Sequence, residues 1–165
     1  MLLISSDGAG VELRPTRYQF PAPPSEPGDW DANWLEIYGR VRTVAGEVWM
    51  FDDACLTTWE ARLLGDWLRL AAAGRVPVTE APTQDSEELL TFTEPNLGFS
   101  VGARADDSLV VRVHLSLESV ADRPGAGEEA PYDSYAYTVP LRVGREELLA
   151  AAQAWDEDTR PFPER

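Results

Sequence analysis

The fold is decided by residues 33–74, which read NWLEIYGRVRTVAGEVWMFDDACLTTWEARLLGDWLRLAAAG. Two long runs with strand-like composition, 33–43 and 47–55, lead directly into a helical pattern over 57–74. A turn through residues 44–46 is short enough to make the two runs an antiparallel hairpin. This order predicts a hairpin followed at once by a helix that packs against it.

The helical pattern over 57–74 has its own start and stop signals. Thr57 and Glu60 have the spacing of a capping box, and Gly74 can adopt the left-handed conformation that ends a helix. Apolar side chains recur at steps of three and four residues, which predicts one buried face. We expect that face to be made of Trp59, Leu63, Trp67 and Leu70, flanked by Leu64, Leu68 and Ala71.

A weaker unit of the same plan follows near the C-terminus. Two strand patterns, 109–117 and 135–143, precede a helix over 145–155 that would bury Leu148, Leu149, Ala152 and Trp155. Pro140 lies within the second run, and because proline has no N–H to donate, we expect an edge strand there. Short strand patterns at 2–5, 11–14, 90–94 and 97–103 complete the set.

These patterns predict an α+β protein with a mainly antiparallel sheet of about eight strands and two amphipathic helices packed on one face. The order lacks the strand-helix alternation of a parallel sheet. A small β-sandwich or barrel with peripheral helices is the alternative. A chain of 165 residues suits one domain, 1–165, with exposed loops at 75–88 and 121–131 and a tail at 156–165.

The charge balance restricts the class of partner. The chain has 29 acidic and 14 basic residues, a formal net charge of -15, and every basic residue is arginine. Such a chain repels nucleic acids and anionic membrane surfaces, so we expect neither as a partner. A cationic protein is the partner that this charge favours, although solubility alone also explains an acidic surface.

The single cysteine, Cys55, cannot form an internal disulfide, which fits a reducing compartment. The opening residues MLLISSDG lack a basic region and a cleavage pattern, so we expect no signal peptide. No run of about 18 apolar residues is present, which predicts no membrane-spanning helix. Together these features predict a cytoplasmic protein.

Catalytic and metal-binding signatures are weak in this sequence. His114 is the one histidine, it falls in the middle of a predicted strand, and we interpret both it and Cys55 as structural residues. A zinc site needs about four ligands within reach, and no clustered spacing supplies them. We therefore expect no catalytic residues, no metal, no cofactor and no enzymatic activity.

A protein-binding surface is the remaining prediction. In 33–43, Leu35, Ile37 and Val41 share the core side of the strand, so the other parity should face outward. We expect Trp34, Glu36, Tyr38 and Asp53 on this outward face. Two points stay open: Trp49 or Phe51 can join these residues, and the loop 21–32 can fold over them. A second acidic group follows in the loop after the first helix, and we predict partner contacts at Glu80, Asp85, Glu87 and Glu88.

Several short motifs resemble those of one known family. They are the segment DANWL at 31–35, the long hairpin after it, the helix over 57–74, the segment TEPNL at 93–97 and the closing strand and helix. In this order they are similar to the WapI-like immunity proteins. The resemblance implies a cytoplasmic antitoxin that binds a toxin encoded beside it, and the negative charge would match a basic toxin domain such as a nuclease.

Two other classes of function stay open at this point. The chain could be a small-molecule-binding module with a pocket between helices and sheet. It could also be a structural homodimer that associates through the open sheet face, so the sequence allows either a monomer or a homodimer.

Overall fold

The structure, a computed structural model, describes residues 1–21, 29–80, 88–125, 135 and 137–165. Its strands form two four-stranded sheets in which every neighbouring pair is antiparallel. Sheet A has the order β1-β2-β3-β4, with bounds Leu2–Ile4, Gly10–Tyr18, Trp34–Arg42 and Val48–Thr57. Sheet B has the order β5-β6-β7-β8, with bounds Leu90–Thr91, Leu97–Arg104, Ser108–Leu115 and Tyr137–Gly144.

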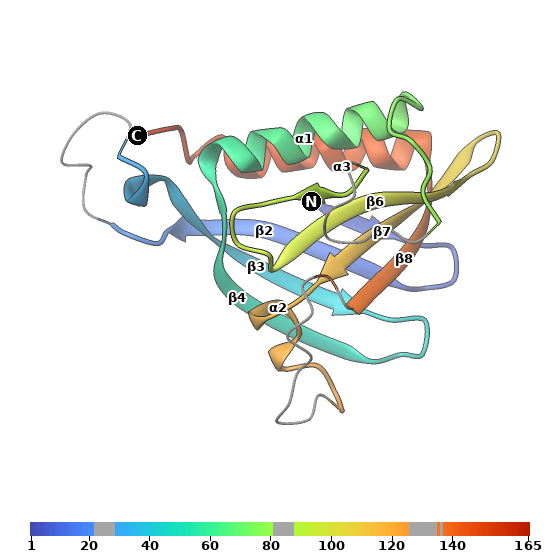
Figure 1. The fold of residues 1–165 in the computed structure, drawn as a ribbon, viewed down its shortest axis with the longest axis horizontal. Coiled ribbons are helices and arrows are strands. Elements are labelled where there is room, and N and C mark those ends of the chain that lie inside the picture. Colours follow the sequence, from blue (N-terminus) through green and yellow to red (C-terminus); the bar gives the residue numbers. More distant parts are fainter. Residues whose placement is uncertain (22–28, 81–87, 126–134, 136) are drawn as a thin grey trace.

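The described residues contain three α-helices and one short 3₁₀ turn. They are α1 at Thr58–Ala72, α2 at Glu118–Ala121, α3 at Arg145–Thr159 and η1 at Asp31–Asn33. Figure 1 shows α1 and α3 side by side along one side of the molecule, with α2 on the opposite side. None of these helices is long and apolar enough to cross a bilayer.

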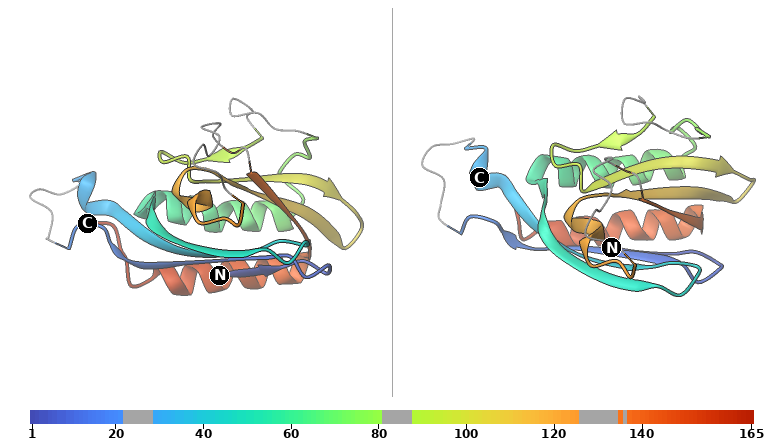
Figure 2. Two further views of the ribbon diagram at one scale, coloured as in Figure 1. Left: turned by 90° about the horizontal axis from the view of Figure 1, so that it is seen from below. Right: turned by 60° about the horizontal axis from the view of Figure 1, so that its bottom comes forward.

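The predicted class, α+β with antiparallel strands, is confirmed, and the eight strands divide into two sheets. Figure 2 shows the blue-to-cyan sheet A and the yellow-to-red sheet B as separate layers. Their edges approach where the backbone N–H of Arg142 in β8 donates to Ser5 Oγ, just after β1, at 3.0 Å. Hairpin signals in a sequence indicate which neighbours pair along the chain, but they do not show where a sheet ends. The helix α2, which is a single turn, was not predicted from the sequence.

The start of α1 confirms the predicted capping box. Thr57 N donates to Glu60 Oε2 at 2.8 Å, and Thr57 Oγ1 accepts from the N–H of Glu60. The other carboxylate oxygen of Glu60 accepts from the N–H of Thr93 at 2.7 Å, so this buried side chain also ties the helix to the segment before β6. Gly74, at φ +76, ends the helix region in the left-handed conformation as expected.

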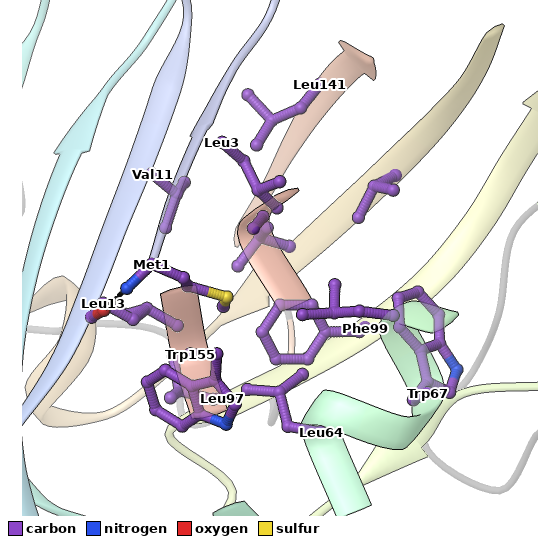
Figure 3. Close-up of a cluster of buried hydrophobic side chains, with 14 of the residues drawn as sticks. Met1, Leu3, Val11, Leu13, Leu64, Trp67, Leu97, Phe99, Leu141 and Trp155 are labelled. Carbon is purple, nitrogen blue, oxygen red and sulfur yellow. Dashed lines mark hydrogen bonds between the residues drawn. The ribbon is translucent and has the colours of Figure 1, made fainter. Parts of the chain in front are cut away.

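The hydrophobic core lies between the two sheets and the two long helices. Figure 3 shows side chains from β1 and β2, from β6 and β8, and from α1 and α3 directed toward one another. Fully or almost fully buried members from each element are Leu3, Val11, Leu13, Leu97, Phe99, Leu141, Leu64, Trp67 and Trp155. Burial of this apolar surface is the main stabilising contribution to the fold.

The buried face of α1 is rotated relative to the prediction. Leu63 and Leu70, which were expected in the core, are 48% and 37% exposed. Trp67 is buried as predicted, and the predicted flanking residues Leu64, Leu68 and Ala71, together with Ala61, form the rest of the buried face. Because large apolar residues surround much of this helix, spacing alone did not identify which stripe packs inward. The contact with α3 selects it, since α1 packs against that helix as well as against strand side chains.

The helix α3 closes the core on the side shared by both sheets. Trp155 is fully buried, and its indole Nε1 donates to Ala61 O of α1 at 2.6 Å. The predicted burial of Leu148, Ala152 and Trp155 is confirmed, whereas Leu149 is 41% exposed. The helix also continues to Thr159, into the predicted tail.

Candidate partner-binding surface

The strand register defines one extended surface, the outer face of sheet A. Side chains alternate along each strand, and residues opposite one another in neighbouring strands share a face. The register pairs Leu2 with Glu12, Glu12 with Arg40, and Arg40 with Met50. Stepping by two along each strand gives the set that we call the outer face of sheet A: Leu2, Ile4, Gly10, Glu12, Arg14, Glu36, Tyr38, Arg40, Arg42, Val48, Met50 and Asp52.

Four apolar side chains on this face are strongly exposed. Leu2 and Ile4 in β1 are 52% and 59% exposed, and Val48 and Met50 in β4 are 40% and 52% exposed. They lie on the two outer strands, so the arginines of β3 stand between them. Single exposed apolar residues are common on protein surfaces, but several of them on one face, interspersed with charged residues, are typical of an interaction site.

The arginines of this face make few contacts with the other described residues. Arg40 and Arg42 are exposed, and neither forms an ion pair with another described residue. Arg14 lies with its guanidinium carbon 5.5 Å from the centre of the Tyr38 ring. Guanidinium groups that are presented in this way, close to apolar side chains, are frequent anchors in protein interfaces.

The face is hollowed on both sides of β1. Because Gly10 has no side chain, a hollow of about 220 Å³ opens between β1 and β3, with Ile4 and Leu2 on one wall and Arg40 and Arg42 on the other. Beyond the edge of β1, a larger groove of about 710 Å³ is bordered by Arg142, Glu147 and the alanines at 150, 151 and 154 of α3. Leu2 and Ile4 therefore form a ridge between two depressions.

The outer face of sheet B is used differently. Arg112 donates to the carbonyl oxygens of Thr79 and Glu80, both at 2.6 Å, and Arg104 donates to the carbonyls of Gly74 and Val76. These bonds fasten the segment after α1 to the sheet. Guanidinium groups are well suited to this, because each presents several donors in one plane.

The chemically reactive side chains are buried within the fold. His114 is 3% exposed, and its ring nitrogens lie 2.8 Å from Ser100 Oγ and 3.3 Å from Thr138 Oγ1. Burial, and to a lesser extent the charge of Arg112, lowers the pKa of His114 to about 4. Ser100 is itself fully buried, so this pair has no access to a substrate.

Cys55 is also buried, and burial raises the pKa of its thiol to about 12. A thiol in this state is a poor nucleophile, because the thiolate is the reactive form. The described residues include no group of three or more His, Cys, Asp or Glu side chains arranged to hold a metal ion. His114 and Cys55 are therefore both enclosed by the fold.

Of the contact residues predicted on sheet A, Glu36 and Tyr38 lie on its outer face. Both are half-buried residues of β3. Glu36 forms an ion pair with Arg17, in which Nη2 of Arg17 lies 2.5 Å from Oε2 of Glu36. Trp34 was expected on the outward face, where cover by other residues was left open, and it is only 9% exposed. Asp53 was also expected there, but it pairs in register with Ile37 on the inner side and accepts from Asn96 Nδ2 at 2.8 Å.

The remaining predicted contacts belong to another region. Glu80 is exposed and Glu88 is half-buried, and both lie in the connection between α1 and sheet B. Asp85 and Glu87 lie outside the described residues. Glu80 and Glu88 thus lie beside sheet B, whereas Glu36 and Tyr38 lie on sheet A.

Sequence reasoning missed the exposed apolar residues of sheet A. Residues 48–51 are four apolar residues in a row, and the sequence left open whether the aromatic ones face outward. In the structure Trp49 and Phe51 are buried, and Val48 and Met50 face outward. The pairing of Val41 with Trp49 decides this, and that register depends on the turn at 43–46. A stricter count of alternation from the core parity of β3 could have found it.

Comparison with known protein families gives one match that covers almost the whole chain. Residues 1–163 match the model described as the immunity protein WapI-like family. No curated protein and no solved structure gives a significant match to the chain.

Proposed function

The chain belongs to the WapI-like immunity protein family, and from this premise we propose that it binds a cognate toxin protein directly and thereby neutralises it. The family match over residues 1–163 is the observation that carries the proposal. Direct binding is supported by the burial of His114 and Cys55 and by the exposed apolar side chains on the outer face of sheet A. In this proposal the protein is an inhibitor without catalytic activity.

We further propose that the toxin domain has net positive charge, as a nuclease would. The support is the formal net charge of -15. Opposite net charges speed the diffusional encounter of two proteins and give an association rate that falls with added salt. Buried Cys55 fits a reducing compartment, and we place the encounter in the cytoplasm.

The acidic residues beside sheet B are proposed to act mainly in this encounter. Glu80 is exposed and Glu88 is half-buried, so both can contribute to the field around the protein. Charges at the margin of an interface change the association rate more than the dissociation rate. Glu36 and Tyr38 remain proposed contacts on sheet A, whereas burial makes Trp34 and Asp53 weaker candidates.

The test is binding to the toxin domain encoded next to this chain, measured by surface plasmon resonance at several salt concentrations. We expect a stable complex and an association rate that falls as salt rises. Glu80→Gln with Glu88→Gln should slow association by a few-fold while dissociation changes little. Gln153→Ala on α3, which leaves the charge unaltered, is the control for substitution itself.

Inhibition must accompany binding. The toxin activity should fall in proportion to the complex formed, with one immunity protein per toxin domain. A toxin that stays fully active while bound, or that shows no binding at low salt, would contradict the proposed function.

A further inference from the structure

The outer face of sheet A has a local charge opposite to that of the whole chain. Arg14, Arg40 and Arg42 lie on it with Glu12, Glu36 and Asp52 as acidic members, and Glu36 is ion-paired with Arg17, while the chain as a whole carries -15. Glu12 stands opposite Arg40 in the register, but the two form no ion pair. An acidic protein thus presents arginines between the exposed apolar side chains of β1 and β4.

From this arrangement we infer that the outer face of sheet A is the surface that anchors the toxin, and that the toxin presents to it an apolar side chain surrounded by carboxylates. The inference rests on the proposed function and adds the contact surface and the chemistry of its counterpart. The hollow over Gly10 receives the apolar side chain, and Arg40 and Arg42 bind the carboxylates. Guanidinium groups bind carboxylates through two parallel hydrogen bonds, which fixes orientation as well as charge.

An acidic patch on a basic toxin is consistent with the two ranges over which charges act. Net charge governs the approach of the proteins until they are within a screening length of about 8–10 Å. Contacts at hydrogen-bond distance then depend on the local groups that meet. The acidic exterior therefore sets the association rate, and the outer face of sheet A sets the dissociation rate.

The dimensions of the face suit a protein partner. Its longest strands have nine and ten residues, which gives a length of about 30 Å at about 3.3 Å per residue. A standard interface covers about 800 Å² on each partner, so a sheet of this length can supply most of it. A second copy of this chain is disfavoured as the occupant, because two chains of -15 repel each other.

The experiment measures the affinity of the purified toxin domain for four variants of the full chain. Met50→Asp and Arg40→Glu alter the face. Leu63→Asp and Arg75→Glu make the same kinds of change at exposed positions elsewhere, on α1 and just after it. Each control matches its partner in charge, so steering by net charge changes equally within each pair. Far-ultraviolet circular dichroism and thermal unfolding establish that all four variants fold.

We expect Met50→Asp and Arg40→Glu each to raise Kd by about 10-fold or more, mainly through faster dissociation, as hot-spot substitutions do. The two controls should stay within about two-fold of the unaltered chain. Arg40→Lys should lose less than Arg40→Glu, because it keeps the charge. Ile4→Asp, on the opposite wall of the hollow, repeats the test should one variant fail to fold.

Three results would overturn the inference. In the first, the variants on sheet A bind like the unaltered chain, or no worse than their matched controls, while toxin binding itself persists. In the second, light scattering gives twice the monomer mass for the unaltered chain and the monomer mass for Met50→Asp, which assigns the face to a second copy. In the third, the unaltered chain does not bind the toxin at all, which removes the proposed function and the inference with it.

Discussion

Sheets A and B both carry arginines on their outer faces, but the contacts of those arginines differ. On sheet B, Arg112 lies across Gly102, where an added Cβ would stand 2.6 Å from its guanidinium carbon, and donates to two backbone carbonyls. On sheet A, the hollow over Gly10 stays open, and the neighbouring Arg40 has no ion pair with a described residue. One face is completed by the chain itself, and the other is left for another molecule. The difference lies in the outer faces, since both inner faces are packed.

The largest effect is expected where the two sheets are alike. Phe99 in sheet B and Ile37 in sheet A are fully buried. Phe99→Ala should therefore lower the free energy of unfolding by about 3–5 kcal/mol, and Ile37→Ala should lower it by about 2–5 kcal/mol. Chemical denaturation followed by tryptophan fluorescence measures both. A change below about 1 kcal/mol at either site would show that the corresponding inner face is not part of the core.

Substitution of the arginines should separate the outer faces. Arg112→Ala removes the two bonds to Thr79 and Glu80, so the free energy of unfolding should fall by about 1–3 kcal/mol. Arg40→Ala should change it by no more than about 0.5 kcal/mol. Equal losses in the two variants, measured by the same denaturation method, would remove the distinction between a completed face and a free one.

The buried histidine of sheet B predicts a pH effect that sheet A lacks. The pKa of His114 is lowered from 6.5 to about 4 in the folded state, so below pH 6.5 the unfolded chain binds a proton that the folded chain does not. Stability from this residue is therefore complete above pH 6.5 and falls as pH decreases toward 4, by about 1 kcal/mol between pH 7 and 5.5. Denaturation at both pH values should show that loss, and His114→Asn should reduce it. An identical pH dependence in the variant would be inconsistent with a neutral buried imidazole.

The smallest effect should come from the exposed apolar residues of sheet A. Met50→Ser and Ile4→Thr remove apolar area that is already more than half exposed, so the free energy of unfolding should change by at most about 0.5 kcal/mol each. Thermal unfolding of the double variant is the measurement. A clear loss of stability would mean that this surface supports the fold, and its exposure would then need no partner to explain it.

Local signals in the sequence predicted the elements well, and the arrangement of those elements less well. The capping box at Thr57 and Glu60, the edge position of Pro140 in β8, and the core parity of Leu35 and Ile37 are all confirmed. Each depends on neighbouring residues or on strict alternation. The division into two sheets depends on which strand edges remain unpaired, and no residue pattern within the chain states that.

The candidate surface could be predicted only in part for the same reason. Arg40 and Arg42 were placed on the outward side of their strand from alternation alone, and they are exposed. Trp34 lies on the same parity, but it comes directly after η1, and a bulge between Leu35 and Glu36 interrupts the regular register there. Leu2 and Ile4 join the face through the pairing of β1 with β2, which brings the first residues of the chain beside its middle.

The position of Trp155 after the strands of both sheets has a consequence for biosynthesis. Each sheet consists of strands that follow one another, so both can form while the polypeptide is still being made. The indole that joins α3 to Ala61 leaves the ribosome only after the strands of both sheets have emerged. Until then the apolar sides of both sheets lack their last cover, and we expect the nascent chain to need protection by chaperones during that interval.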